Sequence, residues 1–154
     1  MAIWYFAYGS NMSPKTFLER RQMTPRATER GWIDGYRLCF DIPVGPGERG
    51  VANLMRDATA RTHGVVHLLG PEDADELDRT EGVPQGFYCR EPVDVVTEGQ
   101  IRSGFTYRST MGTTGRKPSA RYLNILLDGA RIHALPTDYI RFLASFELAI
   151  DERL

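Results

Sequence analysis

An apolar segment that stops abruptly at a Gly-Ser-Asn turn constrains the fold of this chain most strongly. Residues 3–7 read IWYFA, and a continuous apolar run of this length is typical of a strand buried on both faces. Ser13 followed by Pro14 has the pattern of a helix N-cap and first helical residue. The turn at residues 9–11 therefore joins a buried strand to a helix, and the free N–H groups of such a corner favour a carboxylate, a phosphate or an oxyanion. The same turn also fits an ordinary tight connection.

The size and charge of the chain narrow its function. Its 154 residues are enough for a hydrophobic core without disulfides or metals, so we expect a single domain over residues 1–154. Charged residues make up 25% of the chain and the net charge is −1, which argues against nucleic acid as a partner. No segment approaches the roughly 18 apolar residues of a membrane span, and the first residues lack the regions of a secretion signal. We therefore expect a cytoplasmic protein that does not bind membranes.

Cysteine and histidine spacing argues against a metal or redox site. Cys39 and Cys89 stand alone in apolar runs without C-x-x-C spacing, so we expect both to be buried, reduced thiols. His63 and His67 are four residues apart, but they lie in a β-branched run that predicts a strand, and His133 is distant. The chain also lacks a G-x-S-x-G elbow, a P-loop and a Rossmann fingerprint. We predict no bound metal and no cofactor.

The residue patterns predict about six strands and about four helices. Alternation in GYRLCFDI and the apolar runs VANLM and GVVHLL predict three strands after the first. FYCREPVDVV and SGFTYRS predict two more, and Pro92 places the former at an edge or a bulge. Helices are predicted near residues 13–21, over residues 71–81 with Gly82 just past the end, and in two amphipathic segments after Pro118. The sum is an α+β fold with a mixed, mainly antiparallel sheet.

Glu81 is the most unusual acidic residue. Ala74, Leu77 and Glu81 follow one another at helical spacing, so the carboxylate continues a stripe that should face the core. It also stands beside Gly82 at the C-terminal end of the predicted helix, where the helix dipole disfavours an anion. Burial and the dipole both raise the pKa of such a carboxyl, which suits a proton carrier near neutral pH. A solvated glutamate in the last helical turn is the alternative interpretation.

Three tyrosines and a basic cluster are further candidates. The tyrosines are Tyr88, Tyr107 and Tyr122, and each fits either the core or the wall of a binding pocket. The basic cluster is formed by Arg116, Lys117 and Arg121 beside a Gly-rich loop. It fits a site for a substrate carboxylate and equally a solvated basic patch.

Three motifs in this order resemble the γ-glutamylcyclotransferase family. They are YGSN at residues 8–11, GVVHLLGPEDADELDRTEGVPQGFY at residues 64–88, and PSARYLNILLDGARIHALPTDYI near the end. The resemblance implies a small, mixed, mainly antiparallel β-barrel surrounded by helices. It also implies an enzyme that releases 5-oxoproline from a small γ-glutamyl substrate, and it is compatible with a homodimer.

The resemblance further implies roles for individual residues. It places the substrate loop on Tyr8, Gly9, Ser10 and Asn11, the catalytic glutamate on Glu81, and the pocket tyrosines on Tyr88 and Tyr122, with Tyr107 as a third. In the implied reaction the α-amine of the substrate attacks its own γ-carbonyl. Glu81 moves the protons, and N–H groups of the loop stabilise the oxyanion.

The leaving group stays open at this stage. Family members act on γ-glutamyl dipeptides, glutathione, γ-glutamyl-lysine isopeptides or a γ-glutamyl-protected antibiotic. A carboxylate held by Arg116 or Arg121 would favour γ-glutamyl amino acids, and an open, neutral mouth would favour amines. The alternatives are a cyclotransferase for γ-glutamylamines or γ-glutamyl metabolites, a noncatalytic module that binds γ-glutamyl-like ligands, and a structural partner protein that uses its last two helices as an interface.

Overall fold

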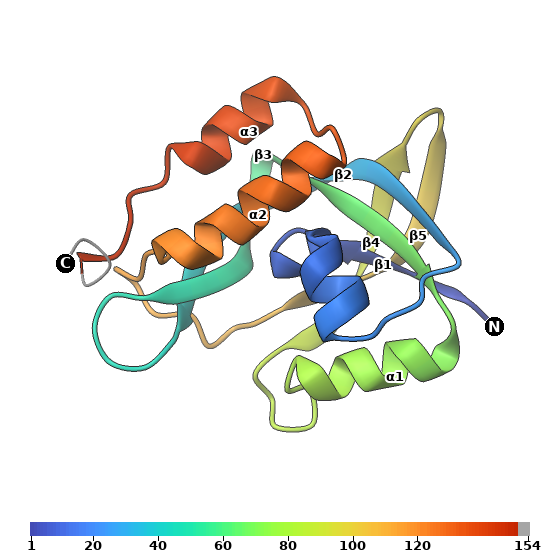
Figure 1. Ribbon diagram of the computed structural model, residues 1–154, viewed down its shortest axis with the longest axis horizontal. Helices are drawn as coiled ribbons and strands as arrows, with labels where there is room; N and C mark the ends of the chain where they lie inside the picture. The colour runs from blue at the N-terminus through green and yellow to red at the C-terminus, as the bar shows by residue number, and fades with distance from the viewer. Residues whose placement is uncertain (151–154) are drawn as a thin grey trace.

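A closed β-barrel forms the centre of the protein (Figure 1). The computed structural model describes residues 1–150, and within them five strands follow one another around the barrel in the order β1-β3-β2-β4-β5. They are β1 (Ile3–Ala7), β2 (Ala27–Pro43), β3 (Gly50–Leu69), β4 (Cys89–Thr97) and β5 (Gln100–Arg108). Neighbouring strands are antiparallel except for β1 and β5, which pair in parallel and close the barrel. The expected mixed, mainly antiparallel barrel is confirmed.

The strand count is one lower than predicted, because VANLM and GVVHLL belong to the same strand. β3 runs for 20 residues and pairs with β2 from Ala27↔Leu68 to Pro43↔Gly50. Residues 56–61, which are mostly exposed, separate the two apolar runs; Arg61 pairs with Asp34 and Arg56 with Tyr36, and the register shifts between these two pairs. β3 therefore passes through an irregularity where the burial pattern stops, and its pairing with β2 resumes on the far side in a shifted register.

Three α-helices and two short helices accompany the barrel within residues 1–150. They are η1 (Ser10–Met12, a 3-10 helix), η2 (Lys15–Arg20, a π-helix), α1 (Pro71–Thr80), α2 (Ala120–Ile132) and α3 (Thr137–Ala144). In Figure 1, α2 and α3 lie together on one side of the molecule and α1 lies on the opposite side, with η1 and η2 between them.

The first predicted helix differs from its expected form. Pro14 has helical backbone angles and begins the segment that continues as η2, as its sequence position indicated. No side chain of the described residues caps this helix, so Ser13 is not the expected side-chain N-cap. The backbone carbonyl of Ser13 instead accepts hydrogen bonds from the N–H groups of Thr16 and Phe17.

The later helices are amphipathic, as their sequences predict. The buried positions include Ala74 and Leu77 in α1, Leu126 and Ala130 in α2, and Tyr139 and Leu143 in α3. Ser119 caps α2 by accepting a 3.0 Å hydrogen bond from the N–H of Tyr122. None of the helices in residues 1–150 combines the length and the apolar character needed to cross a membrane.

The two cysteines differ in their environments. Both are free thiols, and burial raises the pKa of partly buried Cys39 to about 12. Cys89 is exposed, so the expectation that both thiols are buried is wrong for this residue. Cys89 opens β4, and in this strand full burial begins only at Val93, where the core is reached.

Gly129 lets α2 pack directly on the turn that contains η1. A Cβ at this position would lie 2.8 Å from the carbonyl carbon of Met12 and 2.9 Å from the backbone nitrogen of Ser13. Met12 is completely buried, so the turn has no free space into which it could retreat. The lack of a side chain at Gly129 thus sets the distance between α2 and the turn.

We predict that Gly129→Val lowers the free energy of unfolding by about 1–3 kcal/mol, because the new side chain forces α2 away from a packed turn. Urea unfolding of the purified variant measures the change. Asn124→Val is the matched control, since it places the same side chain on an exposed position of α2 and should change stability by less than about 0.5 kcal/mol. Equal effects of the two substitutions would contradict the packing role of Gly129.

Candidate functional site

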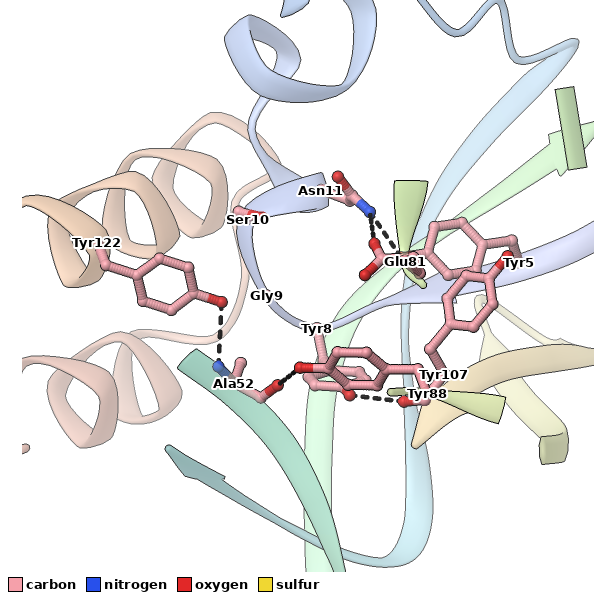
Figure 2. A pocket seen from close by; sticks show the side chains of 10 residues that line it. All are labelled: Tyr5, Tyr8, Gly9, Ser10, Asn11, Ala52, Glu81, Tyr88, Tyr107 and Tyr122. Atoms are coloured by element: carbon pink, nitrogen blue, oxygen red, sulfur yellow. Dashed lines mark hydrogen bonds between the residues drawn. The ribbon is translucent and has the colours of Figure 1, made fainter. Parts of the chain in front are cut away.

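One pocket collects residues from distant parts of the chain at one end of the barrel (Figure 2). Its lining residues are Tyr5, Tyr8, Gly9, Ser10, Asn11, Ala52, Glu81, Tyr88, Tyr107 and Tyr122, and its cavity volume is about 40 Å³. At this end of the barrel β1 and β5 finish, and β3 and β4 begin. All eight site residues expected from the sequence lie in this pocket, and the structure adds Tyr5 and Ala52.

The turn of residues 8–11 is fixed from behind by His67 of β3. The ring Nε2 of His67 lies 3.2 Å from the Asn11 carbonyl oxygen, and its Nδ1 lies 3.0 Å from the Thr28 hydroxyl. Burial lowers the pKa of His67 to about 4, so the ring is neutral at pH 7. A neutral imidazole has one donor and one acceptor nitrogen, so Nε2–H donates to the carbonyl and Nδ1 accepts from the hydroxyl.

Gly9 allows the turn to approach the opposite wall of the pocket. A Cβ on Gly9 would lie 3.2 Å from both the Tyr122 hydroxyl oxygen and the Cβ of Ala52. The next residues form η1, whose first hydrogen bond is donated by the N–H of Met12 to the Gly9 carbonyl at 3.1 Å. The N–H groups that precede this bond have no acceptor inside so short a helix.

Glu81 reaches the pocket from the end of α1. Its N–H still donates to the Leu77 carbonyl at 2.9 Å, and Gly82, with φ of +71°, then turns the chain into the left-handed conformation that ends the helix. Figure 2 shows the Glu81 carboxylate facing Asn11. The Asn11 side-chain Nδ2 donates hydrogen bonds of 3.0 Å to Glu81 Oε1 and to the Tyr5 hydroxyl. The expected direction of Glu81, along the buried face of its helix, is correct.

The surroundings of Glu81 favour its protonated form. Burial raises the pKa of the Glu81 carboxyl, while the positive charge of Arg21 and the hydrogen bond from Asn11 oppose part of this rise. The pKa shift is upward, in agreement with the expectation for a carboxyl on the core-facing stripe. Arg21 was not anticipated from the sequence, because nothing in its local pattern indicates that the end of η2 lies near α1.

Three of the pocket hydroxyls donate to protein acceptors. Tyr8 donates to the Tyr107 carbonyl oxygen at 2.6 Å, and Tyr88 donates to the Ala52 carbonyl oxygen at 2.7 Å. Tyr107 donates to Asp78 Oδ1 at 2.5 Å. Burial is the main cause that raises the pKa of each of these hydroxyls, so all three are neutral at pH 7.

The Tyr122 hydroxyl has a different role. Its oxygen accepts the N–H of Ala52 at 3.1 Å, and it also faces the backbone N–H of Ser10. Burial raises the pKa of Tyr122 to about 12, and these two N–H groups limit the rise. Because both contacts use the oxygen as acceptor, the hydroxyl proton of Tyr122 is available to a ligand in the pocket.

Ala52 takes part through its backbone. β1 pairs with β3 only at residues 65–69, so within the described chain β3 lacks this strand neighbour at Ala52. The N–H and C=O of Ala52 instead bond to Tyr122 and Tyr88 on the pocket side, as Figure 2 shows. Sequence reasoning missed Ala52, since an alanine side chain carries no signal for a backbone contact.

Asp78 ties the end of α1 to the barrel. Its Oδ1 accepts the Tyr107 hydroxyl of β5 and also the Nε–H of Arg90 of β4, at 2.9 Å. Asp78 lies one helical turn before Glu81, so these bonds hold the segment that carries the carboxylate. The i, i+3 spacing of the two acids in the D-x-x-E motif is the sequence signal that points to this residue.

The basic cluster expected near the site is divided. Arg116 donates to the carbonyl oxygens of Gly45 and Arg49 at 3.0 and 3.1 Å, and it therefore supports the loop between β2 and β3. Lys117 pairs with Glu48 at 3.4 Å and also with a second acid of the C-terminal segment. Arg121 is exposed in the first turn of α2 and lines a neighbouring groove.

The pocket presents one carboxyl group, several hydroxyls and backbone donors. Within residues 1–150, no group of three or more His, Cys, Asp or Glu side chains is arranged to hold a metal ion. Glu81 is the single acid among the ten lining residues. Chemically, this arrangement can move a proton at one side of a bound group and donate hydrogen bonds to an oxygen at the other.

Comparison with known proteins matches residues 61–143 to the AIG2-like family. The chain is 32% identical over 162 aligned residues to a gamma-glutamyl cyclotransferase of Aspergillus oryzae, with 90% of this chain and 59% of that protein covered. It is 29% identical over 150 residues to the gamma-glutamylcyclotransferase of Bos taurus, with 93% and 78% covered. The chain thus spans less than two thirds of the length of the fungal relative.

A solved structure named gamma-glutamyl cyclotransferase has the same fold. The TM-score is 0.85, and the match covers 96% of this chain and 89% of that chain at 24% sequence identity. At this identity the likeness concerns the fold. Together with the sequence matches, it confirms the resemblance that the motifs indicated.

We predict a pH-dependent difference in stability between the wild type and Glu81→Gln. The pKa of Glu81 in the folded protein lies above its ordinary value of 4.5. As the pH rises, Glu81 therefore loses its proton in the unfolded chain before it does so in the folded protein. The stability contributed by Glu81 is therefore complete below pH 4.5 and is lost as the pH rises through the folded pKa.

Urea unfolding of both proteins at steps from about pH 4 to about pH 8 measures this difference. The free energy of unfolding of the wild type, minus that of the variant, should fall as the pH rises. Contributions of other groups such as His67 cancel in the subtraction. A difference that is constant or increases with pH would contradict the raised pKa.

Proposed function

Because this chain belongs to the AIG2-like family and is similar to gamma-glutamyl cyclotransferases, we propose that it is a γ-glutamylcyclotransferase. It would convert the γ-glutamyl group of a γ-glutamyl amino acid or amide to 5-oxoproline and release the amine. The observation that carries this proposal is the meeting of Glu81, whose pKa is raised, with the turn of residues 8–11 in one pocket.

The proposed reaction uses the substrate as its own nucleophile. The α-amine attacks the γ-carbonyl carbon, a new C–N bond closes the five-membered ring, and the bond to the leaving nitrogen breaks. Positioning accounts for much of the rate, since effective molarities of well-oriented intramolecular reactions reach ~10⁵ M. A pocket walled by ordered tyrosines suits this task, because Tyr8, Tyr88 and Tyr107 are each fixed by a hydrogen bond to the protein.

In this mechanism Glu81 carries the proton. As a carboxylate it accepts a proton from the α-ammonium group, which makes the amine nucleophilic, and as a carboxylic acid it then protonates the leaving nitrogen. The ring nitrogen gives up its second excess proton to the released amine, which leaves as an ammonium ion. A pKa raised by burial supports this role, since one group must act as base and acid at similar pH. The 3.0 Å bond from Asn11 holds Oε1 and keeps the carboxyl group at the wall of the pocket.

The oxyanion of the γ-carbonyl would be stabilised opposite Glu81. At the start of η1, the N–H groups of Gly9 and Asn11 donate to no acceptor within residues 1–150, because no intrahelical acceptor exists there. The Tyr122 hydroxyl, whose oxygen is engaged by backbone N–H groups, supplies a further donor. We assign the predicted substrate-binding roles of Tyr8, Ser10, Tyr88 and Tyr107 to the walls of the same pocket.

We predict that Glu81→Gln lowers 5-oxoproline release by about 10²-fold or more, because the amide keeps the size of the side chain but cannot carry the proton. The assay follows 5-oxoproline over a panel of γ-glutamyl amino acids, glutathione, γ-glutamyl-ε-lysine and simple γ-glutamylamines. Glu72→Gln is the matched control, since it makes the same change at an exposed position of α1 and should retain wild-type activity.

The panel also separates the alternatives. Release from amines alone would identify a γ-glutamylamine or γ-glutamyl-metabolite cyclotransferase with the same mechanism. Thermal stabilisation by γ-glutamyl compounds without any release would identify a noncatalytic binding module. Near-normal turnover by Glu81→Gln would remove Glu81 from its proposed role.

We predict that Gly9→Val weakens substrate binding and raises KM, because a Cβ at Gly9 would crowd Tyr122 and Ala52 across the pocket. Steady-state kinetics on the best substrate of the panel measures the effect. Ala58→Val, an exposed substitution on β3, is the control for the added side chain. An unchanged KM in Gly9→Val would count against the assignment of the turn to substrate binding.

The proposal includes the remaining expectations for this chain. We propose a single-domain, cytoplasmic enzyme over residues 1–154 that needs no cofactor. Light scattering of the purified protein would determine whether it forms the homodimer that the family resemblance allows.

A further inference from the structure

A second cavity adjoins the pocket across Tyr122. Its volume is about 220 Å³, and its lining includes Arg20, Arg49, Val51, Ser119, Arg121 and Tyr122. We call it the arginine groove. Tyr122 lines both cavities, and Val51 of the groove directly precedes Ala52 of the pocket. The groove therefore lies directly beside the pocket, on the other side of the Tyr122 side chain.

The arginine groove is positively charged. Three guanidinium groups line it, and none of its lining residues is acidic. Arg20, at the end of η2, and Arg121, in the first turn of α2, are both exposed. Neither forms an ion pair with any other residue between positions 1 and 150. Arg49 has contacts of its own in the protein, so Arg20 and Arg121 are the two arginines to which anion binding is assigned.

The two free arginines differ from the other basic residues near the site. Arg116 donates to backbone carbonyls of the loop between β2 and β3, and Lys117 is paired with acids, so their charges serve the fold. Arg20 and Arg121 are 101 positions apart in the chain and bring two like charges to one cavity. An anion bound between them would relieve their repulsion.

We propose that the arginine groove is the subsite for the leaving group and that Arg20 and Arg121 select leaving groups that carry a carboxylate. This inference rests on the proposed cyclotransferase function and names its substrate class, γ-glutamyl amino acids and peptides. A guanidinium presents paired N–H donors that match the two oxygens of a carboxylate, which makes arginine well suited to this selection. A neutral amine would leave both charges without a partner.

The first test compares two substrates of the wild-type protein. γ-Glutamylalanine and γ-glutamylalaninamide have the same reacting atoms and differ only in the charge of the leaving group. We expect kcat/KM to be about tenfold or more higher for γ-glutamylalanine than for the amide, mainly because its KM is lower. Hydrogen bonds to a charged group have a strength that corresponds to this ratio. The preference should weaken with added salt, because the groove is open to solvent.

The second test reverses the charge of each arginine. Arg121→Glu and Arg20→Glu should each reduce the ratio of kcat/KM for the carboxylate substrate to kcat/KM for the amide substrate by about tenfold. Arg121→Glu is expected to fold, since an acidic side chain in the first turn of α2 is favourable to the helix dipole. Arg131→Glu, an exposed position in the last turn of the same helix, is the control and should keep the wild-type preference.

The outcomes separate the two proposals. Equal kcat/KM for the two substrates in the wild type, or an unchanged preference in both charge-reversal variants, would overturn the subsite and leave the cyclotransferase function intact. Absence of 5-oxoproline from either substrate and from the whole panel would overturn the proposed function, and the subsite with it. Loss of the preference in Arg131→Glu as well would also overturn the subsite, because the effect would then follow net charge alone.

Discussion

Closure of the barrel by β1 is the constraint on which the site depends. β1 pairs antiparallel with β3 and parallel with β5, so its C-terminal end emerges where β5 also finishes. The turn after β1 is consequently placed over the mouth of the barrel, where α1 ends and β3 begins. Two contacts hold the turn in place. α2 packs on it at Gly129, and His67 of β3 bonds to the Asn11 carbonyl. The pocket follows from the closure, because its walls come from elements that only the closed barrel brings together.

The chemistry of the pocket depends on a balance around Glu81. Burial favours the neutral carboxyl group, and Arg21 and Asn11 favour the carboxylate, with burial as the largest contribution. The tyrosines add no charge at pH 7, since the ordinary pKa of a tyrosine hydroxyl is 10 and burial raises it further. Positive charge is instead placed outside the pocket, at the arginine groove beyond Tyr122. This separation would let the inner pocket recognise a common γ-glutamyl group while the groove distinguishes what is attached to it.

Local patterns predicted an element well wherever its burial pattern and its backbone hydrogen bonding begin and end at the same residues. The start of α1 at Pro71, its buried stripe and its end near Gly82 follow from capping and helical spacing. The prediction failed where the burial pattern and the backbone hydrogen bonding do not coincide. In β3 the apolar pattern stops over residues 56–61, but the strand continues through a register shift and pairs with β2 on both sides of it, which led to one strand too many. Cys89 has a strand-like, apolar context but precedes the buried part of β4.

By itself the sequence determined the local features of the site. A strand that breaks at Gly9 and an acid on the core face of a helix are properties of short segments, set by chain sterics and side-chain spacing. The tertiary structure alone decided which atoms these features contact. The backbone of Ala52, the charge of Arg21 near Glu81, and the shared groove of the exposed arginines all join segments far apart in the chain. Such meetings depend on strand pairing and barrel closure, which no local pattern specifies, because the interactions that fix them are formed between segments and not within one.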